Sequence, residues 1–350
     1  MKAQHQIKFG RKRSGTPREK NDAKVARNVD SVDVTGAQVV VGERELKFAR
    51  ALSDTEKEVR DASLESLRTW LSENTQSLAD TEIDRLWKAL FYCVWMADKR
   101  PVITATIASV VDLADIVGTK FLEGLFRCLV REWFGIDKHR VDKYYELINV
   151  ALVKSTEGLV AADTDEKFLE ETAVLLKMLD EAVWSRVPKA GLGVALHVLD
   201  VYRDKVMRPV LIRAAKLSGN EVHKVFDSLL EQLYAKMGSS GEHSVAVGNR
   251  IQERVFKGLI PFVGDKDVLL TPKDRRDMMM RASKRIFAIA ADKKTSDELR
   301  KDLYAVRAEL KTYVTLYDEA KEAGRSNGKT NGRNKKDKSG RRSKARKADK

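Results

Sequence analysis

The side chains that most often perform chemistry in proteins are scattered along this chain of 350 residues. None of the histidines has the His-x-Glu or paired spacing that would hold a metal ion. Cys93 and Cys128 do not form a Cys-x-x-Cys pair, and both follow apolar helical patterns, so we interpret them as buried thiols of a protein in a reducing compartment. We therefore predict no metal site. The histidines are His5, His139, His197, His223 and His243.

The motifs of nucleotide-binding proteins and hydrolases are also missing. Gly191-Leu-Gly-Val has two of the three glycines of a dinucleotide-binding loop, and no expected strand precedes it. Neither a phosphate loop nor a serine elbow occurs in the sequence. These observations predict a protein that is not an enzyme and that takes no cofactor and no small-molecule substrate.

The strongest chemical signal is positive charge at the two ends of the chain. Residues 1–30 hold nine Lys/Arg and three Asp/Glu, and residues 324–350 hold twelve Lys/Arg and two Asp. The ends therefore carry +6 and +10 of a total of +14, which leaves −2 for the residues between them. Because both ends have almost no branched apolar or aromatic residues, we expect them to be disordered.

The positive charge of the C-terminal segment has two open interpretations, which are compatible with each other. The clustered Lys/Arg pairs are typical of a nuclear import signal. The same residues would also bind RNA phosphates as a polyelectrolyte arm. The candidates in this tail are Arg333, Lys335, Lys336, Lys338, Arg341, Arg342, Lys344, Arg346 and Lys347, and the basic candidates in the N-terminal leader are Lys8, Arg11, Lys12 and Arg13.

Between the ends, apolar residues recur at helical spacing from about residue 43 to residue 323. Ser53-Asp-Thr-Glu56 has the form of a capping box for the helix that follows it. A stripe of apolar residues runs along the last expected helix, and Gly324 is expected to end that helix. The stripe consists of Leu299, Leu303, Val306, Leu310, Val314 and Tyr317. We expect helices at about 81–97, 119–134, 138–154, 165–185, 190–206, 208–217, 219–237, 244–262, 273–291 and 295–323, with a further one starting near Pro101.

A weak internal repeat indicates how these helices pack. Leu90-Phe-Tyr-Cys93 returns as Leu125-Phe-Arg-Cys128, and Asp98 with its basic neighbours returns at Asp137. Offsets in this range are typical of helical-hairpin repeats. We predict an all-α fold, an antiparallel helical-hairpin (HEAT-like) solenoid with disordered basic N- and C-terminal tails. The predicted parts are a flexible leader (1–42), a helical body (43–323) and a disordered basic tail (324–350).

The helix near residues 81–97 is apolar on almost every side, so it must be buried on almost every side. We interpret its aromatic residues, and Trp133, as core residues because aromatics at helical spacing usually pack inward. These core candidates are Trp87, Phe91, Trp95 and Trp133. The charged residues near them have two open interpretations, as helix caps and inter-helix ion pairs or as a docking face for a protein or an rRNA helix. They are Asp98, Lys99, Arg131, Glu132, Asp137, Arg140, Asp142 and Lys143.

The order of three blocks resembles the Nop52 family, which is the family of ribosomal RNA processing protein 1. The blocks are Leu86-Trp-Lys-Ala-Leu-Phe-Tyr-Cys-Val-Trp-Met-Ala-Asp-Lys99, Arg131-Glu-Trp-Phe-Gly-Ile-Asp137 and Arg140-Val-Asp-Lys-Tyr-Tyr145. The resemblance covers about residues 45–215. It implies a non-enzymatic, nucleolar assembly factor that acts in the early precursor of the large ribosomal subunit and is needed for precursor rRNA processing.

The resemblance also implies partners, namely precursor rRNA of the large subunit, other ribosome assembly factors and ribosomal proteins, with no membrane. The alternative is a helical-repeat adaptor of nuclear transport. Import carriers of this repeat type are usually strongly acidic, whereas the net charge of this helical body is only −2.

Overall fold

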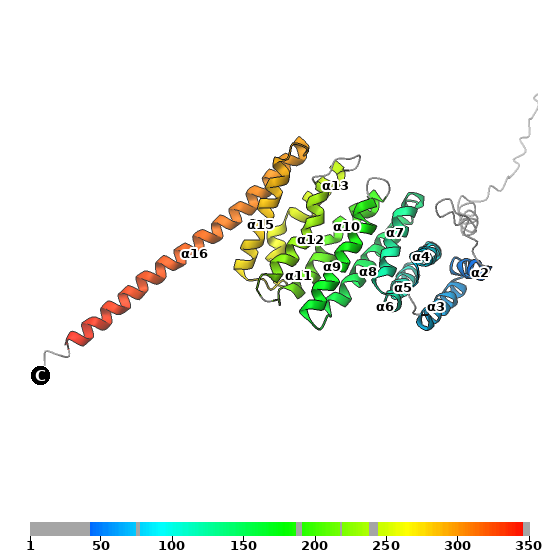
Figure 1. Ribbon diagram of the computed structural model, residues 1–350, viewed down its shortest axis with the longest axis horizontal. Helices are drawn as coiled ribbons and strands as arrows, with labels where there is room; N and C mark the ends of the chain where they lie inside the picture. The colour runs from blue at the N-terminus through cyan, green and yellow to red at the C-terminus, as the bar shows by residue number, and fades with distance from the viewer. Residues whose placement is uncertain (1–42, 75–77, 187–190, 218, 238–243, 346–350) are drawn as a thin grey trace, which may run out of the picture. The chain divides into compact units, whose positions relative to one another are not determined.

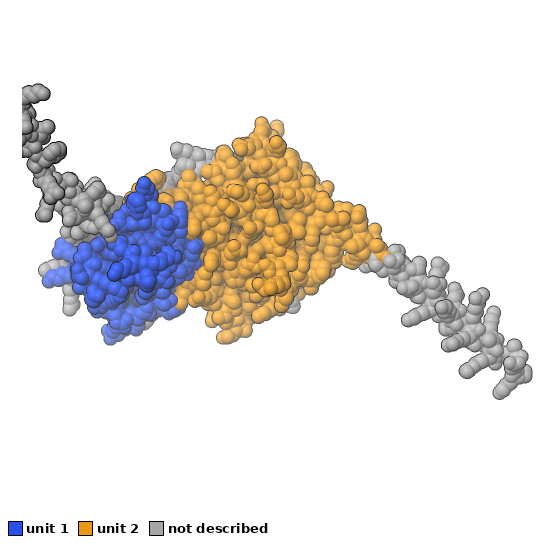
Figure 2. Space-filling view, turned by 180° about the vertical axis from the view of Figure 1, so that it is seen from behind, with its two compact units in different colours: residues 1–129, 136–150 blue, residues 130–135, 151–350 orange. Residues whose placement is uncertain are grey.

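The computed structural model describes residues 43–74, 78–186, 191–217, 219–237 and 244–345. These residues form helices joined by short turns, with no strand among them, which confirms the all-α prediction (Figure 1). None of the helices in the described ranges is both long and apolar enough to cross a membrane. The chain divides into two compact units, which Figure 2 shows in different colours.

Unit 1 contains the described residues up to Leu129 and residues 136–150. Within it, α2 packs on α3 and α4, and α4 also packs on α5. Helices that are close in the sequence therefore pack on one another, as expected for helical hairpins. Its helices are α2 (Glu43–Leu52), α3 (Lys57–Glu73), α4 (Asp80–Trp95), α5 (Arg100–Val111), α6 (Ala114–Val117), most of α7 (Thr119–Glu132) and the first half of α8 (Val141–Val160).

The weak sequence repeat coincides with equivalent hairpins. Cys93 lies on α4 and Cys128 on α7, and both thiols are buried. Asp98 precedes α5, just as Asp137 precedes α8. The repeated residues therefore lie at equivalent positions, in the first helix and the following turn, of the helical pairs α4–α5 and α7–α8.

Unit 2 contains residues 130–135 and 151–350, of which the described part ends at Ala345. Here α12 packs on α9, α11, α13 and α15, and α15 packs most extensively on α16 (Figure 1). Besides the second half of α8, its elements are the turn η1 (Trp133–Gly135), α9 (Asp165–Ala182), η2 (Trp184–Arg186), α10 (Leu192–Tyr202), η3 (Arg203–Met207), α11 (Arg208–Ala214), α12 (Glu221–Met237), α13 (Ser244–Ile251), η4 (Gln252–Phe256), α14 (Leu259–Val263), α15 (Pro272–Ala291) and α16 (Asp297–Ala345).

Two of these elements, η3 and η4, are π-helical turns, and a proline follows each of them. A proline in an α-helix clashes with the carbonyl four residues before it. For Pro209 that carbonyl belongs to Lys205, inside the wider turn η3. For Pro261 it belongs to Lys257, where the backbone is extended and the carbonyl accepts a hydrogen bond of 3.0 Å from Arg203. Each proline is thus accommodated by a local departure from α-helical geometry.

Two expected helix boundaries are wrong. Ser53 does not cap α3, because its hydroxyl donates to the carbonyls of Ala49 and Arg50 at the end of α2, and the residue before α3 is Glu56. Gly324 does not end the last helix, since α16 continues to Ala345. A single helical glycine costs about 1 kcal/mol relative to alanine, which disfavours a helix without ending it.

Candidate nucleic-acid and protein interfaces

The signature aromatics on α4 form the core of unit 1. Trp87 donates from Nε1 to the carbonyl of Phe121 on α7 (2.6 Å), and its ring lies 4.7 Å from the Phe121 ring. Phe91 stacks on Tyr144 of α8 at 4.6 Å, and the Tyr144 hydroxyl donates to the carbonyl of Phe91. Trp87, Phe91 and Trp95 are all buried. Because their ring faces contact other side chains, these aromatics hold three helices together and offer no face to a base.

Two of the candidate charges stabilise the end of α4. The Nζ atom of Lys143 is buried and donates to the carbonyls of Trp95 (2.6 Å) and Ala97 (2.7 Å). A cation is favourable at this end because the helix dipole places partial negative charge there. Burial lowers the pKa of the Lys143 ammonium to about 8, although Asp98 opposes the shift. The guanidinium of Arg140 lies 4.6 Å from the centre of the Trp95 ring.

Asp137 organises the turn before α8. Its carboxylate accepts from the backbone N–H of His139 (2.9 Å) and from the guanidinium of Arg140 (2.5 Å). Partial burial raises the pKa of this carboxyl, but the hydrogen bonds outweigh burial and hold it below its usual value. For Asp137, Arg140 and Lys143 the geometry therefore matches capping and inter-helix pairing.

The other signature charges lie at accessible positions. Asp98, Lys99 and Asp142 are exposed around the α4–α5 turn and the start of α8 in unit 1. In unit 2, exposed Arg131 forms an ion pair of 3.0 Å with the neighbouring Glu132. These five residues remain candidates for docking.

The neighbouring residues Trp133 and Phe134 of unit 2 differ sharply in solvent exposure. The predicted inward position of Trp133 holds only in part, since α7 ends at Glu132 and Trp133 lies in η1 with an intermediate exposure. Its indole covers Gly193 so closely that an added Cβ there would lie 2.0 Å from Nε1. The adjacent Phe134 is 87% exposed, and the helical pattern gave no indication of this because it predicts one continuous helix.

The structure describes little of the predicted basic ends. Lys8, Arg11, Lys12 and Arg13 lie outside the described residues, as do Arg346 and Lys347. The other basic candidates lie on the last part of α16. They are Arg333, Lys335, Lys336, Lys338, Arg341, Arg342 and Lys344.

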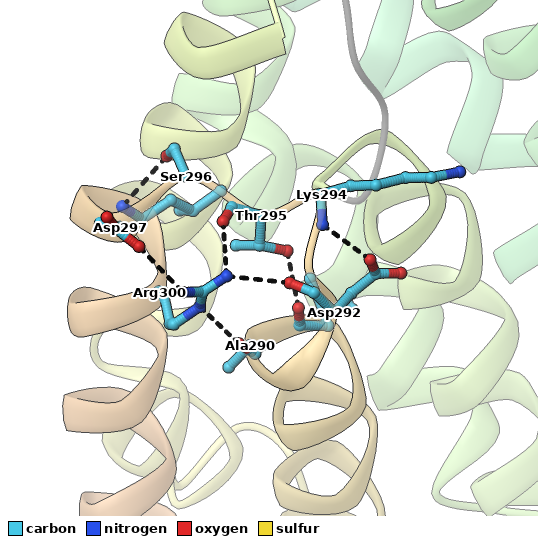
Figure 3. A network of polar contacts seen from close by, with 9 residues as sticks. Ala290, Asp292, Lys294, Thr295, Ser296, Asp297 and Arg300 are labelled. Carbon is cyan, nitrogen blue, oxygen red and sulfur yellow. Dashed lines mark hydrogen bonds and ion pairs between the residues drawn. The ribbon is translucent and has the colours of Figure 1, made fainter.

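The turn from α15 into α16 is fixed by Arg300 (Figure 3). Its guanidinium donates to the carbonyls of Ala290 (3.0 Å), Asp292 (3.1 Å) and Thr295 (2.9 Å), and it pairs with the carboxylate of Asp297 (2.8 Å). The bonds to Ala290 and Asp292 satisfy carbonyls at the end of α15 that have no partner within the helix. The two helices therefore leave the turn in a defined orientation.

Beyond this turn, Phe287 of α15 and Tyr304 of α16 form a pair of accessible rings. Their centroids are 6.3 Å apart, and the guanidinium of Arg307 lies 3.9 Å from the centre of the Phe287 ring. Phe287 is 42% exposed and Tyr304 is 40% exposed. Neither ring was predicted from the sequence to be accessible. One signal could have shown it: each ring immediately follows a buried residue of its helix, so it lies outside the apolar stripe.

Within the described ranges, no group of three or more His, Cys, Asp or Glu side chains is arranged to hold a metal ion. The accessible residues described above instead provide charged and aromatic surface for binding a macromolecule.

Comparison with known proteins agrees with the resemblance seen in the sequence. The family model described as nucleolar protein Nop52 matches residues 43–349, well beyond the region of about 45–215 that the signature blocks indicate. Ribosomal RNA processing protein 1 homolog B of Mus musculus is 32% identical over 193 residues, which is 52% of this chain and 26% of that protein.

Two further relatives align over more of the chain. Ribosomal RNA processing protein 1 homolog A of Homo sapiens is 26% identical over 62% of this chain and 46% of its own length. The homolog of Dictyostelium discoideum is 25% identical over 79% of this chain and 60% of its own length. The alignments therefore span between about a quarter and six-tenths of these relatives. Because the family model covers almost the whole described structure, this chain belongs to the Nop52 family of nucleolar proteins.

Proposed function

We propose that this chain is a non-enzymatic assembly factor of the early large ribosomal subunit precursor and is required for precursor rRNA processing. The observation that carries the proposal is the family match over residues 43–349, which includes the helical body and almost all of the basic C-terminal segment. The names of the relatives refer to ribosomal RNA processing. The place of action would be the nucleolus.

The charge distribution supports a division of labour along the chain. The residues between the two ends have a net charge of −2, whereas residues 324–350 have a net charge of +10. A nearly neutral body suits contacts with assembly factors and ribosomal proteins, for which the exposed signature charges Asp98, Lys99, Asp142 and Arg131 are docking candidates. The basic segment suits rRNA phosphates, and it also fits nuclear import.

Sedimentation tests the assignment to ribosome precursors. The tagged full chain should migrate with large-subunit precursors in a density gradient, and depletion should cause precursor rRNA to accumulate. RNA crosslinking in the same cells would identify the contacted segment. A protein that stays in the light fractions while it carries import cargo would favour the transport-adaptor alternative instead.

A salt series tests the role of the basic segment. Five phosphate contacts to single-stranded RNA predict a log–log salt slope of about −3.5, from about −0.7 per contact. Replacing the nine basic candidates of the segment by glutamine in the full chain should flatten this slope. Replacing the exposed body residues Lys120, Lys177 and Lys216 by glutamine serves as a control and should change it little. Equal slopes for the wild-type chain and the arm variant would show that the body carries the phosphate contacts.

A further inference from the structure

The hairpin of α15 and α16 carries a surface that combines exposed aromatic rings with cations. At its centre Phe287 contacts both Tyr304, through the 6.3 Å ring pair, and Arg307, through the 3.9 Å cation–π contact. Lysines surround this centre at helical spacing, so that each lies about one or two turns from a ring. The aromatic–cationic face consists of Phe287, Tyr304, Arg307, Lys284, Lys301 and Lys311.

Packing within the hairpin does not rest on these rings alone. The contact between the two helices is made by buried residues such as Ile286 on α15 and Leu303 and Val306 on α16. Each ring stands beside this seam rather than in it, with about two-fifths of its surface exposed. Two adjacent exposed aromatics make a larger apolar patch than the single exposed residues found on most surfaces.

The cations of this face are not neutralised by carboxylates. In the described part of the chain, Lys284, Lys301 and Lys311 are exposed and have no ion pair. Other arginines of the same hairpin are paired, since Arg276 bonds Asp318 and Arg300 bonds Asp297. Positive charge is therefore available around the two rings.

We propose that the aromatic–cationic face binds single-stranded RNA, with bases stacked on Phe287, Tyr304 and the Arg307 guanidinium and with phosphates at the three lysines. This proposal rests on the proposed function and places an RNA contact within the helical body, in addition to the basic segment. Exposed rings beside unpaired cations are the pattern of stacking platforms for single strands. A duplex keeps its bases stacked on each other and would use only the charges.

The rigidity of the hairpin favours such a platform. The four bonds of Arg300 fix the turn a single helical turn before Tyr304, and Arg276 with Asp318 ties the helices together at the other end. The rings are thus held near each other before RNA arrives, which lowers the entropy cost of binding. A protein partner that covered this face would have to bring its own carboxylates for four cations.

The test measures binding of the full chain to a short single-stranded RNA that carries the fluorescent base 2-aminopurine, whose emission falls when it stacks. Each ring is expected to contribute about 1–3 kcal/mol, so Phe287→Ala and Tyr304→Ala should each weaken binding by about tenfold. Both variants should lose part of the quenching and keep the wild-type salt slope. Replacing Lys284 and Lys311 by glutamine should instead flatten the slope, by about 0.7 per contact.

Two controls separate a local effect from unfolding. Phe134→Ala removes a ring that is 87% exposed and lies outside the aromatic–cationic face, and it should change RNA affinity less than twofold. Tyr304→Trp keeps a stacking surface and should restore binding. Circular dichroism should show that all variants retain the helical spectrum of the parent chain and stay folded at the temperature of the binding assay.

The remaining outcomes are decisive as well. If the wild-type chain binds RNA and the ring variants bind with the same affinity and quenching, the platform is refuted while the RNA role of the basic segment stands. If the wild-type chain binds no RNA, the RNA part of the proposed function fails together with the platform. If the ring variants bind RNA normally but no longer migrate with precursor particles, the face serves a protein partner and the proposal is wrong.

Discussion

Replacing Gly124 by alanine tests how closely α4 and α7 approach in unit 1. Gly124 lies inside α7, and a Cβ atom there would stand 2.3 Å from Cγ2 of Ile83 and 3.0 Å from Cδ1 of Trp87. Both neighbours are buried side chains of α4, with 0% and 1% exposure, so they have little room to move. Glycine is therefore required here for packing rather than for its backbone freedom.

The expected magnitude follows from two opposing effects. Alanine gains about 1 kcal/mol over glycine from helix propensity. Overpacking of a dense core costs about 1–3 kcal/mol, and the contact with Ile83 is too short to be relieved by a small shift. The net expectation for Gly124→Ala is a loss of up to about 2 kcal/mol, or a decrease of up to a few degrees in melting temperature.

Gly158→Ala is the matched control, because Gly158 also lies within a helix and nothing approaches its Cβ position within 4 Å. It should stabilise the chain by about 0.5–1 kcal/mol. Urea unfolding followed by circular dichroism measures both variants. Adding Ile83→Leu, which removes the methyl at the β carbon, should recover part of the loss at Gly124. If Gly124→Ala stabilises as much as the control does, the close approach of the two helices is refuted.

Three further predictions concern residues with defined contacts. The pKa of Lys143 falls from 10.5 to about 8 in the folded chain, so the unfolded state binds more protons between these values. The free energy of unfolding of the wild-type chain, measured by urea unfolding relative to Lys143→Met, should therefore rise by about 1–3 kcal/mol from pH 7.5 to pH 10. If the difference between the two chains does not change with pH, the ammonium is not buried. Trp133→Ala should destabilise by about 1–3 kcal/mol and Phe134→Ala by less than about 0.5 kcal/mol in thermal melts, and equal effects would mean that the two exposures are wrong. Arg300→Ala should cost about 1–3 kcal/mol and speed hydrogen exchange at the α15–α16 turn, with Arg300→Lys intermediate; unchanged exchange would show that the guanidinium bonds do not hold the turn.

Helix positions could be predicted from the sequence because burial imposes a period of 3.6 residues. Leu299, Leu303, Val306, Leu310 and Val314 are all buried, as their stripe predicts. The resemblance to the Nop52 family was likewise carried by aromatic residues whose order and spacing are specific, and the family match confirms it.

Local features that depend on tertiary contacts were harder to predict. The Ser53–Glu56 pattern does not reveal which of two adjacent helices its hydroxyl serves, and it serves the earlier one. Lys143 is charged and stands beside exposed charges in the sequence, so its burial follows only from the position of the α4 carbonyls. The pairing of Phe287 with Tyr304 joins two helices, and no pattern within either helix could show it.

The π-helical turns have a consequence for how this fold tolerates changes in length. In η3 the N–H of Arg208 bonds the carbonyl of Arg203, and in η4 the N–H of Lys257 bonds that of Gln252, so each turn holds one residue more than an α-turn. Deleting a single residue there would convert the turn to an α-turn and spare the helices on either side. The same deletion in the middle of α12 would rotate every later residue of that helix by about 100° and move its buried face into solvent. Length variation among related chains should therefore be tolerated at these two turns more readily than within the helices around them.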